Sequence, residues 1–289
     1  MTTPVQQMIE KYGCKNTVEY KNALKEVIQE VALCGLSRGG FFKKAAFYGG
    51  TALRIFYGLD RFSEDMDFSL LSKDDSFLID RYFSYLKDEL LANGFEMTVE
   101  RKEKSIKSDV QSAFIKGGTL THLLKIMPVN EKVLGVTDAE LIKIKFEIDT
   151  NPPEGASYEI KYALLPVPYA VQIYDEASLF AGKIHAVLCR SWKSRVKGRD
   201  FYDYLWYLGR RTKPNLLHLQ KRLEQSGKWH SDEKLTMQIL KELLYERFSS
   251  VDFENAKQDV LPFISDSSKL ALWGKDFFCT VTEAYYSGN

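Results

Sequence analysis

Two aspartates separated by one residue, Asp65 and Asp67, have the type and spacing that most clearly suggest chemistry. They alternate with the apolar Met66 and Phe68, the pattern of a strand with one buried face, over residues 64–71. Residues i and i+2 of a strand project from the same face, so both carboxylates point together. Carboxylate oxygens suit Mg²⁺, and two of them can share one or two ions. The pair predicts a magnesium site, with Mn²⁺ as the alternative ion.

Two glycines and a threonine precede this strand and open an expected helix. Gly49 and Gly50 allow close backbone approach to a phosphate, and the helix N-terminus offers unpaired N–H groups. Thr51 either hydrogen-bonds a phosphate or caps the helix. Arg54 and Arg61 either contact phosphate or pair with nearby carboxylates. The order of these features, glycines followed by a helix and then an acidic strand, indicates a site for a nucleoside triphosphate more strongly than any one feature does.

The clearest strand covers residues 141–149. Its apolar face and its charged face alternate, and the two carboxylates of the charged face, Glu147 and Asp149, are candidates for a third metal ligand. Asp149 could instead cap the turn before Pro152. A purely structural interpretation also stands, in which the charged face is a solvated ladder of Lys143, Lys145, Glu147 and Asp149.

A lysine and two aspartates form the third constellation. Lys183 lies on an expected helix, and Asp200 and Asp203 begin another, where acids suit the helix dipole. A lysine can hold the β- and γ-phosphates of a nucleotide, and arginines such as Arg199 can do so with two hydrogen bonds. Asp200 could orient Lys183 or an arginine. The alternative is an ordinary solvated helical surface.

These three stretches resemble a known family. GGTALRIFYGLDRFSEDMDF is similar to the opening of the DNA polymerase β-like nucleotidyltransferases, and more narrowly to the AbiEii/AbiGii toxins of type IV toxin–antitoxin systems. FEIDTNPP resembles a subgroup of the same family. The segment from Lys183 to Asp203 resembles its C-terminal motif, a lysine on a helix followed by an Arg-Asp-x-Tyr-Asp type of run. The resemblance covers roughly residues 40–205.

The resemblance implies a role for each candidate. Glu147, rather than Asp149, becomes the favoured third carboxylate beside Asp65 and Asp67. Asp200 becomes the structural or catalytic partner of Lys183. The residues expected to hold the nucleotide phosphates are Gly49, Gly50, Thr51, Lys183 and Arg199.

The implied activity is transfer of an NMP from an NTP to an acceptor, with the tRNA 3′ end as the expected acceptor and a cognate antitoxin protein as partner. Two other interpretations stay open. The acceptor could be a protein or a small molecule, or the protein could bind nucleotide without turnover. A basic excess over residues 190–222, which includes Lys193, is where an RNA backbone could lie, unless it is only a basic surface.

Composition sets the frame for these sites. The chain has 289 residues, 45% hydrophobic content and a net charge of only +1, so no global field indicates a polyanionic partner. The four cysteines are widely spaced and form no metal-binding motif. With no signal-peptide pattern and no apolar run long enough for a membrane span, we expect a soluble cytoplasmic protein.

The elements that must position the sites predict an α+β fold. We expect a nucleotidyltransferase-like mixed sheet with N-terminal helices over residues 1–173, and a helical domain over 174–289 that completes the nucleotide site. Thr17 is expected to cap a helix that Gly35 helps to end. A helix is expected at 76–93. The stretch 102–109 reads as a charged connector, and 119–127 is ambiguous between strand and helix.

Overall fold

The protein is described here by a computed structural model. It describes residues 3–102, 108–126, 135–190, 195–230 and 232–287. The chain forms two compact units. The first unit comprises residues 1–57, 62–152 and 159–173, and the second comprises 58–61, 153–158 and 174–289.

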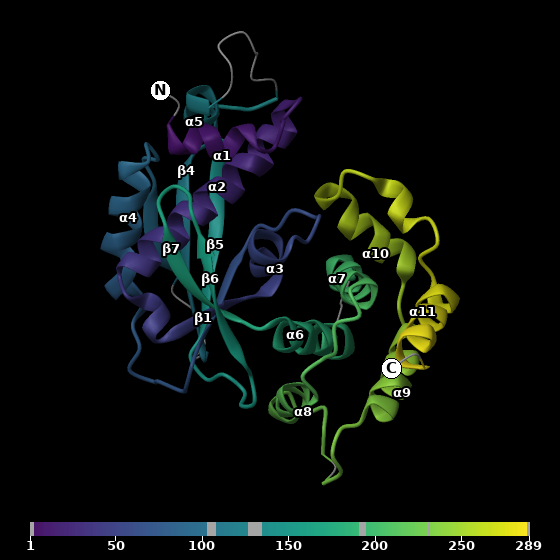
Figure 1. The fold of residues 1–289 in the computed structure, drawn as a ribbon. Helices are drawn as coiled ribbons and strands as arrows, with labels where there is room; N and C mark the ends of the chain where they lie inside the picture. The colour runs from purple at the N-terminus through teal and green to yellow at the C-terminus, as the bar shows by residue number, and fades with distance from the viewer. Residues whose placement is uncertain (1–2, 103–107, 127–134, 191–194, 231, 288–289) are drawn as a thin grey trace. The chain divides into compact units, whose positions relative to one another are not determined.

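A seven-stranded mixed sheet organises the first unit (Figure 1). Its strand order is β3-β4-β5-β2-β1-β7-β6. Strand β2 pairs with β1 in antiparallel fashion and with β5 in parallel fashion, so β2 lies in the middle of the sheet. The strands are β1 (Ala45–Tyr48), β2 (Met66–Leu70), β3 (Thr98–Lys102), β4 (Val110–Gly118), β5 (Leu141–Asp149), β6 (Tyr158–Ala163) and β7 (Tyr169–Tyr174).

The alternation expected from the sequence is present in both acidic strands. Phe68 of β2 and Phe146 of β5 are fully buried and pack with ring centroids 4.7 Å apart. These rings join one core with the apolar side of helix α2 (Thr17–Arg38), which contributes Val27 and Ile28, both fully buried. The polar residues of β2 and β5 therefore lie on the opposite face of the sheet.

The helices of the first unit connect or cover the strands. They are α1 (Pro4–Glu10), α2 (Thr17–Arg38), η1 (Phe41–Lys43), α3 (Gly49–Tyr57), η2 (Ile79–Tyr82), α4 (Phe83–Ala92) and α5 (Thr119–Ile126). The helix expected at 76–93 is thus a 3₁₀ turn followed by a shorter α-helix. The ambiguous segment 119–127 is helical up to Ile126, and residue 127 lies outside the described residues, as do 103–107 of the expected connector.

Two expectations about α2 are wrong. Asn16, not Thr17, caps the helix, because its side chain accepts a hydrogen bond from Glu19 N at 3.0 Å. Asn is the stronger capping residue. Gly35 does not end the helix, which continues to Arg38. A Cβ at Gly35 would lie 2.7 Å from the carbonyl oxygen of Tyr85, so this glycine permits close packing of α2 against α4.

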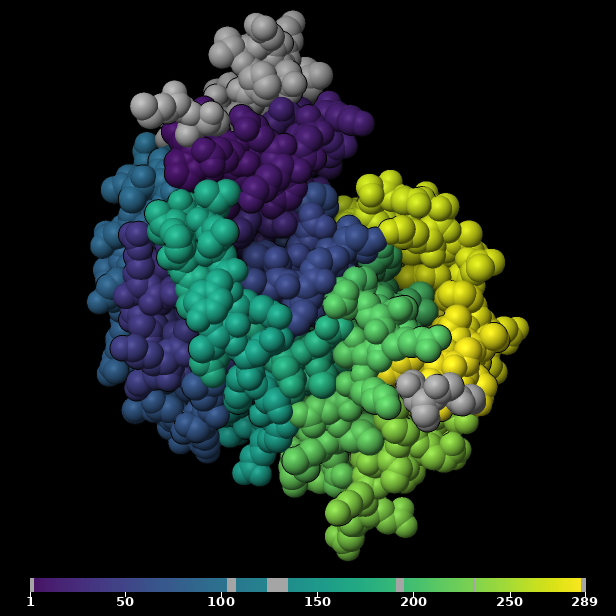
Figure 2. Space-filling model, in the orientation of Figure 1, coloured from purple at the N-terminus to yellow at the C-terminus, as the bar shows by residue number. Residues whose placement is uncertain are grey.

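Strand β6 lies at one edge of the sheet, and several apolar side chains on it or just after it are exposed. Ile160 and Tyr162 are exposed, and so is Leu164 just beyond the strand. The hairpin of β6 and β7, drawn in teal, lies at the surface of the first unit in Figure 2. None of the described helices is long and apolar enough to cross a membrane.

Helices make up most of the second unit. They are α6 (Glu176–Cys189), α7 (Gly198–Gly209), α8 (Leu216–Gln225), α9 (Met237–Phe248), α10 (Phe253–Val260), η3 (Leu261–Phe263), η4 (Ser267–Leu270) and α11 (Lys275–Ser287). Their core is aromatic. Phe278 of α11 packs on Phe201 of α7 and on Phe248 of α9, at centroid distances of 5.6 and 5.3 Å. With a mixed sheet in one unit and helices in the other, the α+β prediction is confirmed.

Candidate active site

Two predicted carboxylates lie side by side in the first unit. Asp67 of β2 and Glu147 of β5 occupy paired positions in the parallel ladder, so their side chains project from the same face of the sheet. We call these two residues the acidic pair. Both are partly exposed, whereas the neighbours that face the core, Met66 and Phe146, are fully buried. Strand register therefore aligns two residues that are far apart in the sequence.

Gly49 lies against the side chain of Asp67. Its φ angle is +83°, and a Cβ built on it would lie 2.5 Å from Asp67 Oδ2. The carboxylate thus occupies the space that a side chain would need, at the first residue of α3. The N–H groups of a helix N-terminus carry partial positive charge, which attracts negatively charged groups. Gly50 follows within the first turn of α3 and is buried.

Thr51 has a structural role that its sequence context does not reveal. Its side chain is fully buried, and its hydroxyl donates a hydrogen bond to the backbone carbonyl of Asp65. The hydroxyl is therefore committed inside the protein instead of facing a phosphate or capping the helix. It ties the start of β2 to α3. Asp65 itself is exposed, one residue before β2 begins.

The two candidates for the third carboxylate have different surroundings. Glu147 accepts hydrogen bonds from Ser112 Oγ at 2.8 Å and from Lys145 Nζ at 2.5 Å. Asp149 lies two residues further along β5, beside Ser69, and accepts a hydrogen bond from Asn151 N at 2.9 Å. Asp149 thus closes the turn after the strand, which was the structural alternative for this residue, and Glu147 is the one that register brings beside Asp67.

The carboxylates of the acidic pair fit a divalent ion that is shared with a substrate. Among the described residues, no three His, Cys, Asp or Glu side chains are grouped so that they could hold a metal ion by themselves. Mg²⁺ is commonly bound by one or two carboxylates together with substrate phosphates and water, without an all-protein cage. The acidic pair, with Asp65 nearby in the sequence, matches that kind of donor set.

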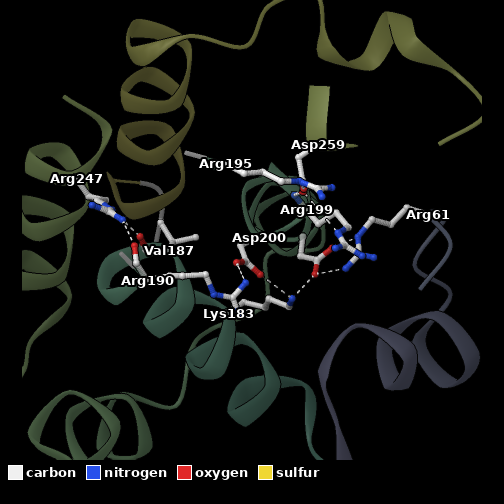
Figure 3. Close-up of polar contacts among 10 residues, drawn as sticks. Arg61, Lys183, Val187, Arg190, Arg195, Arg199, Asp200, Arg247 and Asp259 are labelled. Atoms are coloured by element: carbon white, nitrogen blue, oxygen red, sulfur yellow. Dashed lines mark hydrogen bonds and ion pairs between the residues drawn. The ribbon is translucent and has the colours of Figure 1, made fainter. Parts of the chain in front are cut away.

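In the second unit, Lys183 of α6 lies among carboxylates of α7 (Figure 3). Its Nζ is 3.1 Å from Asp200 Oδ1 and 2.7 Å from Asp203 Oδ2. Arg61 binds Asp203 with two hydrogen bonds, of 2.6 and 2.7 Å. Arg190 Nη1 is 2.6 Å from Asp200 Oδ2. We call these five residues the charged cluster.

Four of the five side chains of the charged cluster are largely withdrawn from solvent, and the fifth, Arg190, is 46% exposed. The side chain of Asp203 is 0% exposed and that of Arg61 is 2% exposed. Burial alone would raise the pKa of Asp203, but the Arg61 guanidinium and the Lys183 ammonium outweigh it and hold that pKa below its ordinary value. Arg61 thus pairs with a carboxylate, one of its two predicted roles, and Arg54 does the same with Glu26 at 2.9 Å.

A second set of contacts supports the ends of α6 and α7 and was not found from the sequence. Arg247 of α9 donates hydrogen bonds to the backbone carbonyls of Val187, at 2.8 Å, and Arg190, at 2.5 Å. Asp259 of α10, whose side chain is 0% exposed, binds Arg195 at 2.6 Å. No local pattern marks Arg247 or Asp259, because each meets its partner about 60 positions away.

Arg199, a predicted phosphate ligand, also lies near Asp259. Its Nε is 3.6 Å from Asp259 Oδ2, and its guanidinium sits over the Phe263 ring at 4.1 Å. Other cations of the 190–222 stretch have partners outside it. Arg210 binds Glu176 and Lys221 binds Glu224. The excess of positive charge around these side chains is therefore smaller in the structure than the sequence of residues 190–222 suggests. Lys193 lies outside the described residues.

A comparison with family models defines the class of the protein. Residues 31–278 match the family described as nucleotidyl transferase AbiEii toxin, type IV TA system. The chain therefore belongs to the AbiEii family of nucleotidyltransferase toxins. This confirms the resemblance that the three sequence motifs indicated.

Two of the solved structures that match the chain come from Helicobacter pylori. The crystal structure of JHP933 is 17% identical, with 91% of each chain covered and a TM-score of 0.49. A second H. pylori structure is 17% identical, with 91% of this chain and 94% of that chain covered and a TM-score of 0.44. No curated protein matches the chain.

Proposed function

We propose that this protein is a metal-dependent toxin that transfers an NMP from an NTP to a hydroxyl group at the 3′ end of a tRNA. The observation that carries the proposal is the acidic pair, which strand register sets on one face of the sheet beside the glycine that opens α3. Family membership supports the reaction class. A cognate antitoxin protein encoded nearby is the expected partner, and the cytoplasm, where tRNA is found, the expected location.

In the proposed reaction, an oxygen of the acceptor hydroxyl attacks the α-phosphorus of the NTP. A new P–O bond forms, the bond to the β-phosphate oxygen breaks, and pyrophosphate leaves. Asp67 and Glu147, with Asp65, would hold Mg²⁺ or Mn²⁺, which supplies charge neutralisation and alignment of the attack when it is bound. The Glu147 carboxylate is also proposed to help take the proton of the hydroxyl as a general base.

The charged cluster is proposed to serve the phosphates of the nucleotide. Asp200 and Asp203 hold the Lys183 ammonium from two directions, which leaves its side chain little freedom. Three cations face two carboxylates in this cluster, so its charge balance favours an anion. Asp200 is a positioning residue in this proposal, because it acts through Lys183 and Arg190. Arg199 and the backbone at Gly49 and Gly50 are the other proposed phosphate contacts.

The test is incubation of the purified protein with each labelled NTP, Mg²⁺ and total RNA. Wild type is expected to label tRNA with one NTP. Asp67→Asn should lower the rate at least about 1,000-fold, since charge stabilisation in the transition state is lost. Asp75→Asn is the matched control, because that side chain is 78% exposed and lies outside the sheet.

Each outcome decides between the proposals. Label on protein or on a small molecule, but not on RNA, would replace the acceptor. Nucleotide binding without turnover in wild type would instead support the non-enzymatic alternative. Full activity in Asp67→Asn would remove the acidic pair from the mechanism.

A further inference from the structure

The face of the sheet that carries the acidic pair also carries a group of lysines. Register places Glu147 beside Ser112, Lys145 beside Phe114, and Lys143 beside Lys116. Phe114 is in turn paired with Glu100 of β3, and Lys102 of that strand lies beside Ser112. These side chains all project from one face. We define the lysine patch as Lys102, Lys116, Lys143 and Lys145 with Phe114.

A half-buried aromatic ring holds three of the lysines together. The Nζ of Lys143 is 4.1 Å from the centroid of Phe114, and those of Lys102 and Lys116 are each 5.7 Å away. A ring attracts ammonium groups through its negative face but carries no net charge. Phe114 therefore gathers cations without neutralising them, as a carboxylate would, and leaves their charge available to an anion.

The patch is more than protection of a sheet edge. Lysines on edge strands commonly prevent unwanted strand pairing, which could account for Lys102 on β3. Lys143 and Lys145 lie instead on β5, which is paired on both sides. Two carboxylates accompany the four lysines, Glu100 on Lys116 at 2.6 Å and Glu147 on Lys145 at 2.5 Å. Positive charge remains in excess.

The patch leads to the acidic pair along β5. Lys143, Lys145 and Glu147 are successive residues of one strand face, and at roughly 3.3 Å per residue Lys143 lies about 13 Å from Glu147. The lysines also spread over three strands, a width of roughly 10 Å. An extended chain of phosphates suits such a row better than the compact triphosphate of one nucleotide.

We propose that the lysine patch binds the phosphate backbone of the acceptor polynucleotide and leads its terminal hydroxyl towards Asp67 and Glu147. The inference rests on the proposed function for the identity of the acceptor, a nucleic acid. It assigns a separate surface to that acceptor, distinct from the residues proposed to hold the NTP.

The test compares the double variant Lys116→Gln/Lys143→Gln with wild type. The probe is a fluorescent single-stranded RNA, titrated with protein over a range of salt concentrations. Each phosphate contact on a single strand contributes about 0.7 to the slope of log K against log salt, so the slope should fall by about 1.4 and affinity at 0.1 M salt by roughly 25-fold. The KM for NTP should not change.

Two further variants complete the design. Lys44→Gln/Lys73→Gln removes two exposed lysines of the same unit outside the patch and should leave RNA binding unchanged. Phe114→Leu keeps an apolar side chain but removes the ring, and should weaken RNA binding by about two- to five-fold. Thermal unfolding of each variant establishes that loss of binding is not loss of fold.

The outcomes separate this proposal from the proposed function. An unchanged salt slope in Lys116→Gln/Lys143→Gln, or absence of RNA binding by wild type, overturns the lysine patch. A rise in the KM for NTP that equals the loss of RNA binding would assign the patch to the triphosphate instead. If wild type binds RNA through these lysines but transfers no NMP, the patch stands and the proposed reaction fails.

Discussion

The acidic pair and the charged cluster are built in different ways. Asp67 and Glu147 are placed by backbone register, since their strands pair whatever the side chains on the solvent face are. Lys183 and Asp203 are placed by each other, through ion pairs between helices and the segment 58–61. The first arrangement leaves carboxylates at a surface, where they can bind a cation. The second buries its two carboxylates among three cations, so each side chain depends on the others for its position.

This difference predicts which substitutions should affect activity and which should affect stability. A side chain positioned by the sheet can be changed with little effect on folding, because the ladder remains. A buried charge whose partner is removed keeps its desolvation cost without compensation. We therefore expect substitutions in the acidic pair to lower activity, and substitutions in the charged cluster to lower stability first.

Among substitutions that keep both carboxylates, we expect Gly49→Ala to lower activity most. The new Cβ would lie 2.5 Å from Asp67 Oδ2, so the carboxylate must move. We expect roughly a 100-fold or greater loss of transfer, since a displacement of about 1 Å can cost that much. Gly58→Ala is the matched control. That glycine also has a positive φ, +79°, but its Cβ would meet open space. Equal activity loss in both variants would mean that backbone strain, and not Asp67, is responsible.

The next effect is on folding. Asp203→Asn removes the carboxylate that pairs with buried Arg61 and leaves Lys183 with Asp200 alone, and we expect it to lower the free energy of unfolding by about 3–5 kcal/mol. Asp67→Asn should change it by less than about 1 kcal/mol. Urea denaturation of both variants measures the contrast. Similar losses would show that the acidic pair is as much a structural element as the charged cluster.

The two units should respond to pH with opposite signs. Burial lowers the pKa of His218, in the second unit, to about 4 and raises that of Glu30, in the first, to about 7. Between pH 6.5 and 4 the unfolded state takes up more protons at His218 than the folded state does, so stability falls as pH falls, by about 3 kcal/mol in total. Between pH 7 and 4.5 the folded state holds the proton of Glu30, so stability rises as pH falls.

Hydrogen exchange of each unit between pH 7 and pH 4.5 measures these responses. His218→Gln should flatten the pH dependence of the second unit, and Glu30→Gln that of the first. His185, whose pKa burial also lowers to about 4, adds to the response of the second unit. A common sign in both units would refute the assignment.

The smallest effect is expected where an ion pair is exposed. Lys269 pairs with Asp60, and each side chain is 46% exposed. Lys269→Gln should cost less than about 1 kcal/mol in urea denaturation, since solvent screens such pairs. Asp60 adjoins Arg61, so a loss comparable with that of Asp203→Asn would extend the structural role of the cluster to the surface.

Much of the fold was predictable from local pattern. The alternation of Ile142, Ile144, Phe146 and Ile148 is enough to define β5, and the helix after Gly49 follows from its composition. Helix ends were less predictable. Asn16 and Thr17 are both residues that cap helices, so local sequence does not choose between them. Gly35 disfavours a helix when it is considered alone, and its role is seen only in its close approach to Tyr85 of α4.

In the candidate site, too, local pattern predicts some features and not others. Carboxylates on strands can be recognised because side-chain direction follows from a period of two. That Glu147 and not Asp149 lies beside Asp67 depends on the register between strands, which the sequence of neither strand determines. The pairing of Arg61 with Asp203 joins residues 142 positions apart, and no periodicity reports such a contact.

The four residues 58–61 have a consequence for modularity. They belong to the helical unit by their contacts, although the segments on both sides of them, residues 1–57 and 62–152, belong to the sheet unit. A gene fragment that starts at residue 174 would encode Asp203 and Lys183 but not the guanidinium that accompanies them. Such a fragment is expected to aggregate or remain unfolded when it is expressed alone. The helical unit therefore cannot be exchanged between relatives as a simple C-terminal cassette, because part of its interior is encoded more than a hundred codons upstream.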